Sequence, residues 1–71
     1  MNQTILIRLE KEAEKMVLQI PASLESEEFT WLFNEKFAEL IVRECANIAT
    51  INTHQWETPG TYVLKHFGVE E

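Results

Sequence analysis

The segment from about residue 25 to residue 50 constrains the fold most, because its pattern predicts one long helix. Neither proline nor glycine interrupts the chain between Pro21 and Pro59. Three glutamates, at 25, 27 and 28, fall near its start, where carboxylates oppose the positive end of the helix dipole. Ser23 or Ser26 is the expected N-cap. A helix of this length, about 39 Å, must pack against other helices and dominates any small fold.

The apolar side chains of this helix cover an unusually wide arc. At about 100° per residue the arc spans about 200°, whereas a surface helix of a monomer needs about half of that. One face carries Phe29, Phe33, Phe37, Leu40, Ile41 and Ile48, and the arc continues through Trp31, Ala38, Val42, Cys45 and Ala49. Two short companion helices cannot cover the whole arc. We therefore predict a homo-oligomer whose interface is formed by this second group, which contains Trp31, Ala38, Val42, Cys45 and Ala49.

Shorter helices are predicted on either side. Residues 3–19 have helical apolar spacing, although residues 4–9 alone also fit an alternating strand. Thr58 and Pro59 have the N-cap and first-turn pattern of a third helix, which Gly68 ends in a Schellman motif with Val69. The predicted fold is all-α: one domain, residues 1–71, with a hairpin of two long helices, a short C-terminal third helix and an oligomeric assembly.

Charge and composition exclude several classes of function. The 71 residues include 6 Lys+Arg and 12 Asp+Glu, a formal net charge of −6, and every acid is a glutamate. This charge disfavours binding to DNA or RNA, which requires a basic face. The apolar runs are too short for a membrane span and no signal peptide is recognisable, so we expect a soluble, intracellular protein without a membrane partner.

Two segments resemble a known group of proteins. Residues 37–46, FAELIVRECA, and residues 64–71, LKHFGVEE, are similar to the "FAELIVRECA…KHFGVEE" signature of small tailed-bacteriophage accessory proteins, mostly of unassigned function. The resemblance covers roughly residues 33 to 71. It implies a phage protein acting in the host cytoplasm, where such proteins inhibit defence enzymes or sequester nucleotide signals. No catalytic residue comes with it.

Neither a metal site nor an enzyme is predicted. Cys45, His54 and His66 are the soft ligand candidates, and their spacing fits no zinc motif. Cys45 lies among apolar residues with Glu39 and Glu44 nearby, and burial and negative neighbours raise a thiol pKa and quench its reactivity. We expect no cofactor and no catalytic residue.

The candidate binding residues are Trp56, His54, Thr58, Thr61, Glu44 and Arg43. Glu44 falls inside the apolar arc, so it should either pair with Arg8, Lys65 or His66 or meet a ligand. Trp56, in a polar loop, either covers the helix junction, anchors a partner or stacks on a base. Thr58, Thr61 and the Gly60 N–H could receive a phosphate.

The predicted function is binding without catalysis: a phage accessory protein that neutralises a host defence or regulatory protein. The alternative is an oligomeric sponge that traps a nucleotide second messenger, and a third is a structural or assembly role. The net charge favours a protein target, because a sponge needs local cations and only Arg8, Arg43 and Lys65 are well placed.

Overall fold

The computed structural model describes residues 1–20 and 25–69, which form three helices: α1 (Gln3–Leu18), α2 (Ser26–Ile51) and α3 (Pro59–Phe67). No strand occurs in these two ranges. The prediction of an all-α chain with two long helices and a short third is confirmed. Residues 4–9 are helical, which excludes the strand alternative.

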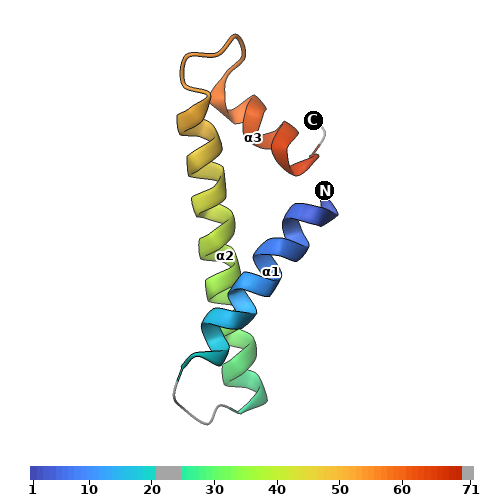
Figure 1. Cartoon of the computed structure of the whole chain (residues 1–71), viewed down its shortest axis with the longest axis vertical. Coiled ribbons are helices and arrows are strands. Elements are labelled where there is room, and N and C mark those ends of the chain that lie inside the picture. Colours follow the sequence, from blue (N-terminus) through green and yellow to red (C-terminus); the bar gives the residue numbers. More distant parts are fainter. Residues whose placement is uncertain (21–24, 70–71) are drawn as a thin grey trace.

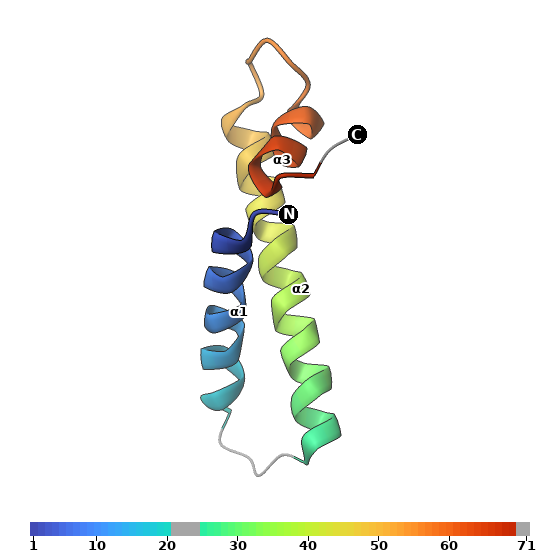
Figure 2. The same ribbon diagram turned by 90° about the vertical axis from the view of Figure 1, so that its right-hand side faces the viewer.

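The long α2 is the spine of the molecule, and the other two helices lie along one side of it (Figure 1). α1 runs against one half of α2 in the opposite chain direction, and α3 folds back over the other half (Figures 1 and 2). The end of α3 therefore meets the start of α1. There the Asn2 N–H donates a hydrogen bond of 2.5 Å to the Phe67 carbonyl oxygen. α1 and α3 therefore meet at an angle on the same side of α2 (Figure 1).

The ends of α3 follow the predicted capping chemistry. The Thr58 side chain accepts a hydrogen bond from the Thr61 N–H at 3.4 Å, with Pro59 at the first helical position. Gly68 adopts the left-handed conformation, with φ 70°. The two hydrogen bonds of a Schellman motif follow, from the Val69 N–H to the Leu64 oxygen at 2.9 Å and from the Gly68 N–H to the Lys65 oxygen at 3.2 Å.

The start of α2 differs from the sequence prediction. Its N-cap is Glu25, in an extended conformation and without a side-chain cap hydrogen bond, and Ser26 is already helical. Ser26 as the N-cap is therefore wrong, and Ser23 lies outside the described residues. Glu27 and Glu28 lie in the first turn, as predicted. Their negative charges oppose the positive end of the helix dipole and stabilise this end of α2 without a side-chain cap.

The core is thin. Among the described residues four hydrophobic side chains are buried: Leu9, Ala13, Val17 and Phe67. None of them belongs to α2, whose apolar residues are either partly buried or exposed. The Cα radius of gyration is 14.7 Å, whereas a compact chain of this length is expected near 11 Å. The longest helix thus contributes no buried residue to the core.

Candidate functional site

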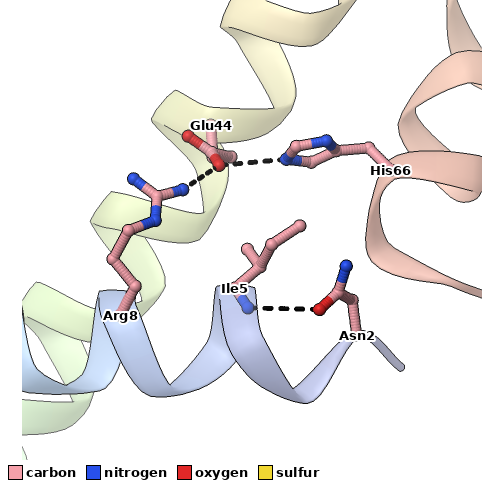
Figure 3. A network of polar contacts seen from close by, with 5 residues as sticks. All are labelled: Asn2, Ile5, Arg8, Glu44 and His66. Atoms are coloured by element: carbon pink, nitrogen blue, oxygen red, sulfur yellow. Dashed lines mark hydrogen bonds and ion pairs between the residues drawn. The ribbon is translucent and has the colours of Figure 1, made fainter.

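A charged cluster ties the three helices together at Glu44 on α2 (Figure 3). The Glu44 Oε2 atom accepts hydrogen bonds from the Arg8 guanidinium of α1 and, at 3.0 Å, from Nε2 of His66 on α3. The Glu44 side chain is 17% exposed. Two of its three predicted partners are confirmed, and the third, Lys65, pairs elsewhere.

The cluster favours the ionised form of Glu44. The hydrogen bond from His66, together with the nearby Arg8 charge, lowers the pKa of Glu44 below its ordinary value of 4.5, although partial burial acts in the opposite direction. The carboxylate is thus held as an anion between two donors from different helices. This arrangement fits a structural latch, since both of its hydrogen-bonding partners come from the chain itself.

Asn2 supports the same junction and was missed from the sequence. Its side-chain Oδ1 accepts a hydrogen bond from the Ile5 N–H at 3.3 Å and so caps α1 (Figure 3). Its own N–H binds Phe67, whose ring packs edge-on against His66 at 5.2 Å between centroids. An asparagine directly before an apolar helical repeat is an N-cap signal that could have identified this role.

Trp56 lies in the loop between α2 and α3 with 99% of its surface exposed. The sequence alternative that it covers the helix junction is therefore wrong. The loop itself is braced on both sides of this ring. The Thr53 hydroxyl donates to the Thr50 carbonyl oxygen at 2.9 Å, and Glu57 pairs with Lys65 of α3 at 2.5 Å. The indole is therefore held on the surface of the molecule, with the loop tied on either side of it.

The ion pair between Glu57 and Lys65 also changes the pKa of the lysine. The carboxylate of Glu57 raises the pKa of Lys65 above its ordinary value of 10.5. The Tyr62 hydroxyl accepts from the Glu57 N–H at 3.5 Å, which adds a second tie between loop and helix. Glu57 and Tyr62 were not among the predicted site residues. An acid placed one turn before a helix that carries lysine and tyrosine gives only a weak sequence signal.

The predicted phosphate receptor at the start of α3 is largely occupied by the chain itself. The Thr58 and Thr61 hydroxyls bind each other at 2.9 Å, and Thr58 also accepts the Thr61 N–H. A Cβ added at Gly60 would meet nothing within 4 Å, so the backbone there faces open space rather than a cradle. His54 is exposed in the same loop.

The six predicted binding residues fall into separate places. Trp56, His54, Thr58 and Thr61 share the α2–α3 loop and the first turn of α3. Glu44 belongs to the latch, whereas Arg43 is exposed and pairs with Glu39 of its own helix at 2.7 Å. The structure thus brings together the loop residues and leaves Glu44 and Arg43 outside that group.

The residues predicted to form an oligomer interface share one face of α2, which we call the seam. Trp31 is 67% exposed and Val42 66% exposed. Ala38 is exposed as well, while Cys45 and Ala49 are half-buried. In the single chain the seam is uncovered over much of its length, as expected for the part of the arc that α1 and α3 do not reach.

A basic stripe on α1 was also missed. Arg8, Lys11 and Lys15, with Glu12, line a shallow hollow along this helix. Their spacing at successive helical turns was visible in the sequence.

No cluster of three metal-ligating side chains occurs in the described ranges, and no helix there has the length and hydropathy to cross a membrane. Searches of protein-family models, curated proteins and solved structures return no significant match for this chain.

Proposed function

We propose that the chain is a non-catalytic, homo-oligomeric phage accessory protein that acts in the host cytoplasm by binding a host defence or regulatory protein. The contact is made by the α2–α3 loop, with Trp56 as its anchor. Phage origin rests on the resemblance of residues 37–46 and 64–71 to phage accessory proteins.

The single observation that carries the proposal is the exposure of Trp56, 99% on a braced loop. A side chain of this size gains much when it is buried against a partner, and tryptophan is enriched among the residues that dominate protein interfaces. Because Glu57 and Thr53 already hold the loop, little ordering free energy is lost on binding.

A nucleotide sponge has less support. Three of the cations that it could use, Arg8, Arg43 and Lys65, each already pair with a glutamate of the same chain. The basic stripe on α1 has Glu12 within it, which opposes a phosphate there. A polyphosphate would have to displace these acids in a protein of formal charge −6. A protein target avoids this conflict, since an acidic body with an aromatic anchor suits a basic or mixed surface.

The test compares Trp56→Ala with Leu18→Ala in capture from lysate of the phage's host. Leu18 is 67% exposed on α1 and serves as a matched apolar loss away from the loop. We expect both variants to keep the helical circular dichroism of the wild type. Only Trp56→Ala should lose a partner that the wild type captures stoichiometrically. Equal capture by both variants, or a co-purifying nucleotide in place of a protein, would overturn the proposal.

A further inference from the structure

The seam residues of α2 are spaced symmetrically in the sequence about Leu40. Together with Glu35, which lies between its first two members in the sequence, the seam follows alternating steps of three and four residues, the repeat of a two-helix coiled coil: Trp31, Glu35, Ala38, Val42, Cys45 and Ala49. The two central members, Ala38 and Val42, lie at equal distances in sequence from Leu40. Trp31 and Ala49 do as well, and so do Glu35 and Cys45.

This symmetric spacing determines which residues face each other when two copies of α2 pack antiparallel. If two α2 helices run antiparallel with their Leu40 residues level, every seam residue faces its counterpart across that centre. Trp31 then lies opposite the partner's Ala49, and Val42 opposite the partner's Ala38. Each of these layers joins a large side chain to a small one, which fills space without clash.

A parallel pairing fits less well. It would place each residue opposite its own copy, so that Glu35 meets Glu35 and Trp31 meets Trp31. Like charges at a seam position are unfavourable. One layer of two tryptophans would be crowded, and the layers of two alanines at positions 38 and 49 would leave voids. In the antiparallel pairing Glu35 faces a cysteine, and Glu39 beside the seam is already neutralised by Arg43 at 2.7 Å.

The exposed surface supports a partner of this size. The chain exposes 5479 Å², whereas a compact monomer of 8.3 kDa is expected to expose about 4,600 Å². The excess, about 900 Å², is close to the surface of about 800 Å² that each partner buries in a standard interface. With four side chains buried in the described ranges, the single chain also lacks the core that a stable domain of this size requires.

We infer that a second copy of this chain covers the seam, with the two α2 helices antiparallel and centred on Leu40. The inference rests on the homo-oligomeric part of the proposed function and is independent of what Trp56 binds. Its occupant is a second copy rather than another protein because, in this register, each large seam residue faces a small one of the other copy: Trp31 faces Ala49 and Val42 faces Ala38.

Cysteine cross-linking reads out the direction of pairing. In the antiparallel dimer the two Cys45 residues are displaced by about 15 Å along the axis, which is too far for a disulfide. Mild oxidation, or a short bifunctional thiol reagent, should therefore leave the wild type uncross-linked. Glu35→Cys places a thiol opposite the partner's Cys45 and should give a covalent dimer. The double variant Glu35→Cys/Cys45→Ser should lose it.

The same cross-linking experiment distinguishes parallel pairing and other registers from the proposed dimer. A wild-type dimer cross-linked through Cys45 indicates parallel pairing and overturns the inference. A dimer by light scattering that neither the wild type nor Glu35→Cys can cross-link overturns the register. Capture of a partner that depends on Trp56 stays a separate measurement, so the failure of one does not imply the failure of the other.

Light scattering over a dilution series tests whether the seam is an interface at all. Val42→Glu should raise the dimer dissociation constant by at least about 100-fold, because each dimer carries the buried charge twice. Leu18→Glu, at 67% exposure compared with 66% for Val42, is the matched control and should leave dimerisation unchanged. A wild type that is a folded monomer at micromolar concentration, or equal effects of both variants, would overturn the inference.

Discussion

The Glu44 latch gives the sharpest prediction, because one carboxylate oxygen joins three helices. The informative change is His66→Phe, which removes the hydrogen bond of 3.0 Å to Glu44 but keeps an aromatic ring against Phe67. A hydrogen bond to a charged group is worth about 1.5–3 kcal/mol. Glu44 keeps Arg8 and is 17% exposed, so we expect a free energy around or just below the lower end of that range, about 1–2 kcal/mol.

The assay is a double-mutant cycle by thermal unfolding at fixed protein concentration. In a chain of this size each kcal/mol lowers the midpoint by about 4–8 °C. Glu44→Leu should cost less than about 1 kcal/mol, because an apolar side chain suits its place in the apolar arc. Once Glu44 is leucine, His66→Phe should become nearly neutral, which gives a coupling free energy of about 1–2 kcal/mol.

Arg43→Ala is the control for this cycle, since its exposed pair with Glu39 should contribute at most a few tenths of a kcal/mol. Additive effects of His66→Phe and Glu44→Leu would refute the latch.

Two further predictions follow from the same geometry. The pKa of Glu44 is lowered, chiefly by the His66 hydrogen bond, so the unfolded chain binds its proton more readily; the latch's contribution is complete above pH 4.5 and is lost as the pH falls through the lowered value. Urea titrations at several pH values should therefore show a smaller acid loss in Glu44→Leu than in the wild type, and parallel curves would contradict the assignment. Gly68→Ala should cost about 1–2 kcal/mol because Gly68 is left-handed, and more because the new Cβ would lie 3.2 Å from the Asn2 nitrogen. Gly60→Ala, which meets nothing within 4 Å, should be neutral or stabilising by up to about 1 kcal/mol; similar unfolding midpoints for the two variants would refute this difference.

The parts of the fold that were predictable depend on local chemistry. Thr58, Pro59 and Gly68 define α3 because capping and left-handed geometry involve residues close in sequence. The partners of Glu44 were narrowed to three cations because a carboxylate inside an apolar arc must be compensated. The choice among them was not local, since Arg8 and His66 reach Glu44 only once α1 and α3 meet end to end.

The residues that were not predicted depend on the path of the chain. The hydrogen bond from Asn2 to Phe67 joins the two ends of the molecule, and no spacing rule links positions so far apart. Three alternative roles were left open for Trp56 because the sequence does not determine whether a loop folds back on a helix or projects away from it. Its exposure follows from the Glu57–Lys65 and Thr53 ties, which hold the loop in a projecting shape.

The proposed dimer would couple folding to pairing, because the core of the single chain is thin and its seam is uncovered. If the dimer supplies the missing burial, unfolding separates two chains, and the thermal midpoint must rise with protein concentration. Unfolding 71 residues absorbs about 50 kcal/mol per chain, or about 100 kcal/mol per dimer, which gives an increase of about 5 °C for each tenfold rise in concentration. Val42→Glu should abolish this dependence and lower the midpoint, whereas Leu18→Glu should preserve it. Calorimetry over a hundredfold range would detect a shift of about 10 °C, and a wild-type midpoint independent of concentration would mean that the four buried side chains and the latch suffice to hold a single chain folded.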